Sequence, residues 1–264
     1  MAGTKATGVP LVEIAAHLDS LLRTSDVPDY PGALNGIQVE NAGPVHRVAV
    51  AVDASLQTIH GALDEGADLL LVHHGLFWAG AQPLRGRVYE RFRCLLTNDI
   101  AVYSSHLPLD LHPTLGNNAL FARALGLDPL EGFARFQSIM VGVMGNTDID
   151  TATLVERAGG IARAEGGALV TVGVTPGRRT RRWAICTGAG ASSGTLREAA
   201  DADVDTLIVG EGAHHTGVEA RELGIAVLYA GHYATETFGV RALGDELHRR
   251  FSLPWTFIHA PTAL

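Results

Sequence analysis

An internal repeat restricts the possible folds of this sequence more than any other feature. When the second half of the chain is shifted back by 137 positions, residues 51–75 lie over residues 188–212 without a gap. Each copy contains a helical segment followed by an apolar segment, and after each copy come a further helix and an Ile-Ala-Val segment. Nine aligned positions are identical: Ala54/Ala191, Ser55/Ser192, Thr58/Thr195, Ala62/Ala199, Asp64/Asp201, Asp68/Asp205, Leu70/Leu207, Val72/Val209 and Gly75/Gly212.

The apolar segments of both copies favour parallel strands. They do not alternate polar and apolar residues, as expected where helices cover both faces of a parallel sheet. The predicted fold class is therefore α/β, with two intertwined α/β repeats whose largely parallel or mixed sheets are covered by helices. The repeats are predicted over residues 1–130 and 131–264, packed as one unit. Residues 168–187 are predicted to form a hairpin with a basic tip.

Composition excludes several classes of protein. The net charge of −8 argues against a nucleic-acid partner, since proteins that bind nucleic acids normally carry a basic surface. Only Cys94 and Cys186 are cysteines, too few for a disulfide framework or a cysteine-rich zinc site. No apolar stretch approaches the ~18–20 residues that span a bilayer, and residues 1–10 lack the apolar core of a secretory signal. A soluble, cytoplasmic protein without membrane contact is expected.

Twelve histidines are the compositional feature that points to chemistry, and many of them gather where predicted strands end. In open parallel sheets, ligands bind beyond the carboxyl ends of the strands. Four such ends carry polar side chains: His73 and His74; His106 and Asp110; Glu211, His214 and His215; His232 and Glu236.

Spacing alone does not select the functional residues among these. Neighbouring side chains on a strand point to opposite faces, so His73 and His74 can serve one site only if the strand ends there, which Gly75 would permit. His232 and Glu236, four residues apart, would share one face of a helix. The same spacing joins His215 and Glu219. A histidine at a strand end also often caps the chain or donates a hydrogen bond without binding a ligand.

The donor types nevertheless suit a metal. Imidazoles and carboxylates together bind zinc, iron, manganese or cobalt. Three histidines and two carboxylates exceed the needs of one tetrahedral zinc with an open position, and they fit two divalent ions about 3.5–4 Å apart.

The sequence resembles the Nif-three-like family, whose members are often named GTP cyclohydrolase I type 2 homologues. The stretches that carry the resemblance extend over nearly the whole chain: NGIQVE (35–40), VHHGLFWAG (72–80), SSHLPLDLHPTLGNNALFARALGL (104–127) and GHYATETFGVRALGDEL (231–247). The resemblance implies the fold of two intertwined repeats, and residues 136–182 are too few for the domain that some relatives carry inserted in mid-chain. It also implies a toroidal homohexamer, a trimer of dimers, and a dinuclear metal centre with the ligands His73, His74, Asp110, His232 and Glu236.

Two functions remain open at this point. The first is a metal-dependent hydrolase acting on a nucleotide, a phosphoester or a cyclic amide-like small molecule, with His106 as a proton carrier or as a group behind the ligands. The alternative is a non-enzymatic metal-holding ring that binds a partner protein or delivers metal. The resemblance makes His214, His215 and Glu219 structural, and Glu211 is expected to face the cavity of the site.

Three aromatic residues and one glycine-containing segment near the expected site are predicted to have structural roles. Trp78, Phe77 and Tyr233 flank predicted ligands and could stack on a planar ring, although packing against helices is the expected role. The GAGASSG segment (188–194) lacks the lysine of a phosphate-binding loop, so a tight strand-to-helix turn is expected there.

Overall fold

The computed structural model describes residues 8–264, so the part of the N-terminal predictions that falls on residues 1–7 lies outside the described residues. The chain forms two compact units. The first unit contains the described residues up to Leu109 together with Gly239–Ala260, and the second contains Asp110–Phe238 and Pro261–Leu264. These bounds differ from the predicted repeats, because the switch between units falls at 109/110 and the later segment 239–260 returns to the first unit.

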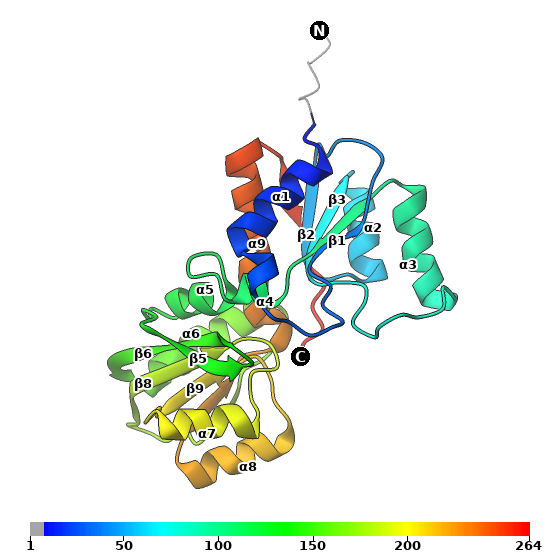
Figure 1. The fold of residues 1–264 in the computed structure, drawn as a ribbon. Coiled ribbons are helices and arrows are strands. Elements are labelled where there is room, and N and C mark those ends of the chain that lie inside the picture. The colour runs from blue at the N-terminus through cyan, green and yellow to red at the C-terminus, as the bar shows by residue number, and fades with distance from the viewer. Residues whose placement is uncertain (1–7) are drawn as a thin grey trace. The chain divides into compact units, whose positions relative to one another are not determined.

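The first unit is built on a five-stranded sheet. Its strands follow the order β1 (Gly36–Val39), β4 (Ala101–Ser104), β3 (Leu69–His74), β2 (Val48–Asp53) and β11 (Trp255–Phe257). Only β1 is antiparallel to its neighbour. In Figure 1 the strands of this unit lie between α1 (Leu11–Leu22) on one side and α2 (Leu56–Asp64) and α3 (Gly86–Thr97) on the other.

Alternate side chains of these strands fill two buried faces. Ala49, Leu70 and Val102 pack with Ile59 of α2 and Leu95 of α3. The intervening residues are buried on the opposite face, where the hydroxyl of Tyr103 donates a hydrogen bond to Asp19 of α1 at 2.8 Å. This two-sided burial explains why the strands read as continuous apolar segments.

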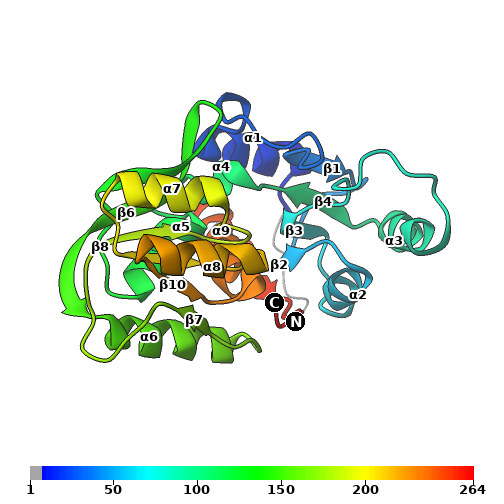
Figure 2. The same ribbon diagram turned by 90° about the horizontal axis from the view of Figure 1, so that it is seen from below.

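A six-stranded sheet forms the second unit. Its strands follow the order β5 (Glu131–Phe136), β6 (Ile139–Asp150), β8 (Arg179–Cys186), β9 (Thr206–Val209), β10 (Ala226–Tyr229) and β7 (Val170–Val172). The central strands β8, β9 and β10 are parallel, and the others are antiparallel to their neighbours. Helices α7 (Ser193–Asp201) and α8 (His214–Leu223) cover one face and are nearest the viewer in Figure 2. Helices α5 (Asn117–Ala124) and α6 (Thr151–Ala164) cover the other.

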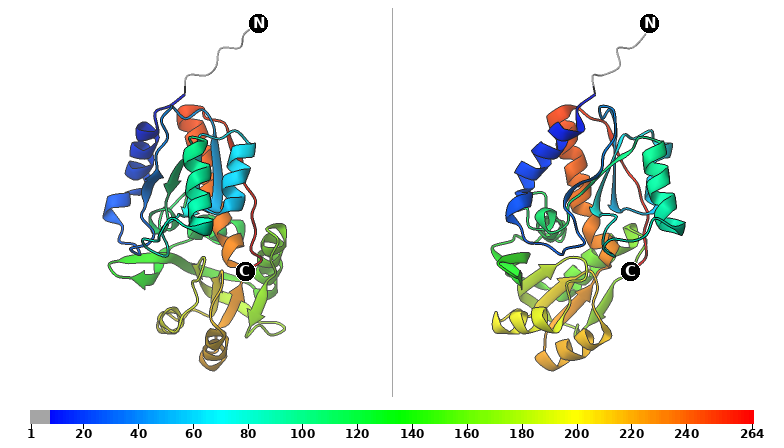
Figure 3. Two further views of the ribbon diagram at one scale, coloured as in Figure 1. Left: turned by 90° about the vertical axis from the view of Figure 1, so that its right-hand side faces the viewer. Right: turned by 45° about the vertical axis from the view of Figure 1, so that its right-hand side comes forward.

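Three further elements complete the chain. A 3-10 turn covers Thr24–Asp26, and the short helix α4 (Leu107–Asp110) lies at the switch between the units. The long helix α9 (His232–Phe251) begins in the second unit and continues in the first. There it lies beside α1 in both views of Figure 3, and Glu246 of α9 pairs with His17 of α1 at 2.8 Å.

The predicted repeat is present in the structure at the level of single hydrogen bonds. Ser55 begins α2 with a capping box formed with Thr58, and Ser192 begins α7 with the same box formed with Thr195. The four-strand order β1-β4-β3-β2 of the first unit corresponds to β7-β10-β9-β8 of the second, with an antiparallel edge strand in each. The predicted fold class is therefore confirmed.

The structure adds an insertion that the gapless alignment does not include. Val48 pairs with Leu69 in the first unit, whereas Trp183 pairs with Thr206 in the second. The first strand of the repeat is therefore displaced by 135 positions and the second by 137. Two extra residues consequently lie between the end of β8 and Ser192, in the glycine-containing turn at 188–190.

The predicted hairpin at 168–187 is wrong. β7 pairs with β10 at one end of the sheet, and β8 pairs with β6 and β9. The antiparallel edge of β8 is already occupied by the twelve-residue strand β6, so the short β7 pairs with the edge of β10. Among residues 8–264, no helix is both long enough and apolar enough to cross a membrane.

Candidate metal centre

The two adjacent histidines lie at the end of β3, which is the condition for both to serve one site. The strand ends at His74, His73 is fully buried, and the centroids of their rings lie 4.8 Å apart. Gly75 follows the end of the strand, as expected, without a positive φ. A Cβ at Gly75 would lie 2.1 Å from the amide nitrogen of Gln38. Gln38 therefore closes tightly over this strand end, and its Oε1 accepts a hydrogen bond from the backbone of Leu76 at 2.7 Å.

Hydrogen bonds at Nδ1 orient each of the two rings. Nδ1 of His73 lies 2.9 Å from the carbonyl oxygen of Ser105. Because a carbonyl can only accept, this Nδ1 carries a proton. Nδ1 of His74 lies 2.9 Å from a carboxylate oxygen of Asp53 at the end of β2. Metal-binding histidines characteristically donate their second nitrogen to a carbonyl or a carboxylate in this way.

His106 joins the same cluster. One ligand atom each of His73, His74 and His106 lies within 4.8 Å of the others. Nδ1 of His106 donates to Asp29 at 2.8 Å. The edge of the Trp78 ring approaches His106 with 4.7 Å between the ring centroids. His106 is thus placed as His73 and His74 are, among the possible ligands. Its predicted role was that of a group behind the ligands.

Asp29 holds this part of the first unit together. Besides His106, its carboxylate accepts hydrogen bonds from the side chain of Asn35 at 2.8 Å and from the backbone of Leu107 at 2.9 Å and Tyr30 at 2.7 Å. Burial works to raise the pKa of Asp29, but His106 and the other donors outweigh it, so the pKa lies below its usual value. Asp29 therefore stays ionised and orients the imidazole of His106.

In the second unit, His232 and Glu236 share the first turns of α9. Nε2 of His232 lies 3.1 Å from Oε2 of Glu236, and its Nδ1 lies 2.9 Å from Oε1 of Glu211. Burial alone would lower the pKa of His232, but the hydrogen bonds and charges of Glu236 and Glu211 overcome it and raise the pKa to about 9. The expectation that Glu211 faces this group of residues is confirmed within the second unit.

Asp110 lies at the end of α4, where it is buried. Its Oδ1 accepts a hydrogen bond from the amide of Asn117 at 2.8 Å. Burial and the negative charges of Asp110 and Glu236 together raise the pKa of the Cys186 thiol to about 12. Both carboxylates are thus close enough to the end of β8 to act on one thiol, which stays protonated at neutral pH.

Gly188 makes room for the pair on α9. Its φ is +61°, and a Cβ there would lie 2.1 Å from Oε1 of Glu236 and 3.3 Å from Nε2 of His232. The two-residue insertion after β8 therefore brings a backbone without a side chain against these donors. The segment that contains it is the expected strand-to-helix turn, closed by the capping box of α7.

The residues of the second His-x3-Glu pair lie on α8. His214 and His215 are exposed at the start of α8. Glu219 accepts a hydrogen bond from Ser193 of α7 at 2.7 Å, which joins the two helices.

Among the described residues, the three imidazoles of His73, His74 and His106 in the first unit lie close enough together to hold a metal ion. Each of the four relevant imidazoles has its Nδ1 beside an oxygen acceptor, and the accompanying carboxylates are buried or hydrogen-bonded. Sequence reasoning missed Asp29, Asp53 and Asn117. Asp53 ends a strand next to His74 and could have been found by the same strand-end argument. Asp29 precedes His106 by 77 residues, and no spacing signal joins them.

The chain is similar throughout its length to proteins of one family. Residues 10–262 match the family model described as Duf34/NIF3 (NGG1p interacting factor 3). A protein of Deinococcus radiodurans named GTP cyclohydrolase 1 type 2 homolog is 41% identical over 253 residues, which cover 96% of this chain and 94% of that protein. A protein of Pyrococcus abyssi with the same name is 38% identical over 252 residues, which cover 96% and 98% of the two chains.

Two solved structures share the fold at 35% identity. The protein ybgI, described as of unknown function, has a TM-score of 0.87 and covers 97% of this chain and 100% of its own. A protein of Thermus thermophilus has a TM-score of 0.81 with the same coverage.

Proposed function

The chain belongs to the Duf34/NIF3 family, and from this premise we propose that it binds two divalent metal ions and acts as a metal-dependent hydrolase. The proposed ligands are His73 and His74 of the first unit and Asp110, His232 and Glu236 of the second. One observation supports this most strongly: each histidine of the set has an oxygen acceptor at Nδ1, the arrangement that is characteristic of metal-binding histidines. Bound divalent ions would make a water molecule more acidic and stabilise negative charge on a substrate oxygen.

The residues around the proposed ligands would perform the remaining steps. Asp29 accepts a hydrogen bond from Nδ1 of His106. Nε2 of His106 would then accept a proton from an attacking water molecule and return it to the leaving group. Asp53 and Glu211 hold His74 and His232 in the same way. The proposed substrate is a nucleotide, a phosphoester or a cyclic amide-like compound. The relatives' name, GTP cyclohydrolase 1 type 2 homolog, refers to a nucleotide, which is one of these classes.

Elemental analysis of the native protein tests the metal part of the proposal. We expect two divalent ions per chain in the wild type. His74→Ala and Glu236→Gln each remove a ligand from a different unit and should each lower the metal content. His215→Ala is the matched control, because His215 is an exposed histidine in the competing His-x3-Glu pair. A wild-type protein that takes up no divalent ion would reject the proposal.

A hydrolase screen tests the reaction. Metal-loaded protein should hydrolyse at least one compound among nucleotides, phosphodiesters and cyclic amides, and His74→Ala should abolish that activity. If the wild type and His74→Ala proceed at the same rate with every compound, the protein is not a hydrolase of this type.

The ligand-like placement of His106 favours a second candidate function, a non-enzymatic ring that holds metal for a partner protein or for delivery. A third imidazole on an ion would occupy a position that a substrate needs. Release of metal to a chelator separates the two functions. A delivery protein should lose its metal readily, whereas a hydrolytic centre should retain metal through many turnovers.

The assembly and location of the protein belong to the same proposal. From the family resemblance we expect a cytoplasmic homohexamer, a trimer of dimers, without bound nucleic acid. A native mass six times that of the chain would support the hexamer.

A further inference from the structure

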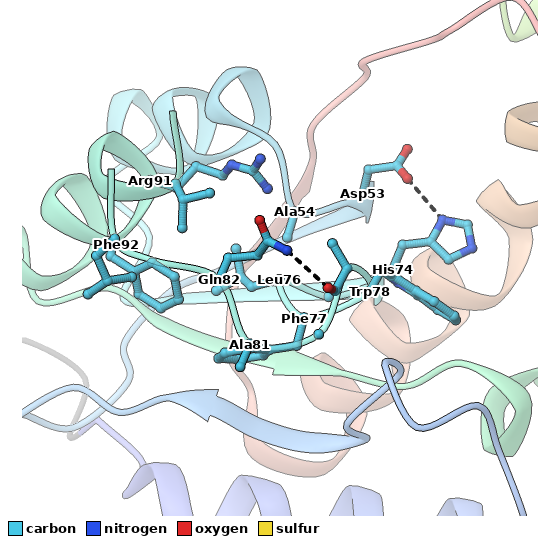
Figure 4. Close-up of a pocket in the computed structure, with 15 residues that line it drawn as sticks. Asp53, Ala54, His74, Leu76, Phe77, Trp78, Ala81, Gln82, Arg91 and Phe92 are labelled. Carbon is cyan, nitrogen blue, oxygen red and sulfur yellow. Dashed lines mark hydrogen bonds and ion pairs between the residues drawn. The ribbon is translucent and has the colours of Figure 1, made fainter. Parts of the chain in front are cut away.

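A cavity of about 520 Å³ opens beside the histidines of the first unit, wholly within that unit. Asp53, Ala54 and His74 form one part of its wall, and the rest comes from residues 75–92, including the loop after β3 and the first half of α3. Figure 4 shows His74 with its partner Asp53 at one end of the group and Arg91 and Phe92 at the other. The volume lies in the range of small-molecule sites, which is about 300–1,000 Å³.

Aromatic side chains line the cavity between His74 and its far end. Phe77 and Phe92 pack together with 5.9 Å between their ring centroids. The ring of Trp78 stands edge-on to His74 at 5.6 Å, yet 38% of its surface is exposed. Phe77 and Trp78 were both expected to pack against helices. Phe77 does so, because it packs against Phe92 of α3, whereas Trp78 remains partly exposed. Trp78 leaves a large aromatic surface open at a cavity, which suits contact with a planar ring.

The far end of the cavity is positively charged. Residues 85–93 contain four arginines and one glutamate, in a chain whose net charge is −8. Arg91 lines the cavity near its far end, and in Figure 4 its guanidinium extends from α3 in the direction of Asp53. Among residues 8–264, no carboxylate forms an ion pair with Arg91, so its charge is available to a ligand. Guanidinium groups favour phosphate and carboxylate partners, which they can bind with two hydrogen bonds.

From this arrangement we infer that the cavity binds a small molecule with a planar aromatic ring and an anionic group, the ring against Trp78 and the anion on Arg91. The inference rests on the proposed function in one respect: a ligand bound in the cavity would lie next to His74, which is one of the proposed metal ligands. It narrows the proposed substrate from a nucleotide, a phosphoester or a cyclic amide-like compound to an anion of mononucleotide size that carries a planar ring.

Calorimetric titration of the metal-loaded protein tests the inference with guanosine monophosphate and uncharged guanosine as probes. Wild-type protein should bind the monophosphate at least about tenfold more tightly than guanosine. Arg91→Gln should remove this difference and leave the affinity for guanosine within about twofold of the wild type. Arg93→Gln is the matched control, an exposed arginine on the same helix outside the cavity, and it should behave as the wild type.

Tryptophan fluorescence locates the ring. The chain has three tryptophans, and Trp183 is fully buried. Guanosine should quench the wild type, and Trp78→Phe should lose most of this quenching. Circular dichroism and metal content establish that each variant is folded.

Two results would overturn the inference: Arg91→Gln binding the monophosphate as the wild type does, or quenching by guanosine that persists in Trp78→Phe. Failure of the proposed function looks different. Binding that depends on Arg91 and Trp78, without hydrolysis of any compound, would leave the cavity assigned and reject the catalytic role.

Discussion

At the scale of single residues, His232 carries a proton that a metal ion has to displace. Its pKa of about 9 in the metal-free protein means that the imidazole is charged at neutral pH, because Glu236 and Glu211 stabilise the charged form. A metal binds only the neutral ring, so uptake must release this proton. The affinity for metal should therefore rise as the pH is raised towards about 9 and level off above it.

Calorimetry in buffers with different heats of ionisation counts the released protons. At pH 7.5 we expect about one proton from His232 per chain, and fewer in Glu211→Gln, because removing that charge lowers the pKa of His232. His215→Ala should release as many as the wild type. An affinity independent of pH between 6 and 9 would contradict the assignment of His232 as a ligand.

Asp29 provides a second prediction at this scale. Its carboxylate accepts four hydrogen bonds, and the amide of Asp29→Asn would turn a donor towards at least one of those donors. The unsatisfied group should lower the free energy of unfolding of the metal-free protein by about 1–3 kcal/mol at pH 7. Asp26→Asn, an exposed carboxylate nearby, should have little effect.

The pH dependence of the Asp29→Asn effect follows from the lowered pKa of Asp29. A group whose folded-state pKa is depressed stabilises the fold fully above its unfolded value of about 3.9 and loses that contribution as the pH falls through the folded-state pKa. Denaturant unfolding should therefore show the difference between wild type and variant shrinking below about pH 4. A difference that stays constant down to pH 2 would show that the charge of Asp29 is not its cause.

At the scale of structural elements, the turn between β8 and α7 leaves space for the side chain of Glu236. Gly188 and Gly66 have nearly the same φ, +61° and +64°, but a Cβ at Gly66 would meet open space. Both Gly188→Ala and Gly66→Ala should therefore cost roughly 1 kcal/mol of backbone strain. Only Gly188→Ala should also weaken metal binding, because its methyl group would displace Glu236. Equal metal affinities in the two variants, measured by competition with a chelator, would show that Glu236 is not a ligand.

Local patterns account for much of what the sequence predicted correctly at this scale. The strand end at His74 and the helical pair His232–Glu236 are set by residues within a few positions of each other. Contacts between distant segments left no such pattern. The pairing of β7 with β10 depends on which sheet edges are free, and the bond from Asp29 to His106 depends on how a loop folds back.

At the scale of the whole molecule, the ligand set proposed for the metal comes from both compact units. A ligand that binds only the folded state stabilises it by an amount that grows with its concentration, about 2.7 kcal/mol at one hundred times the dissociation constant. Removal of metal should therefore lower the melting temperature. The ligand assignment also predicts where this loss of stability falls: at the end of β3 in the first unit and at the start of α9 in the second.

Hydrogen exchange followed by mass spectrometry resolves these positions. After chelation, amide exchange should accelerate around His73 and His74 and around His232 and Glu236, and readdition of metal should slow it at both places. In Glu236→Gln, metal should no longer protect the start of α9. Faster exchange confined to the first unit would instead assign the metal to the three imidazoles of His73, His74 and His106, and it would favour the metal-holding function over the hydrolase.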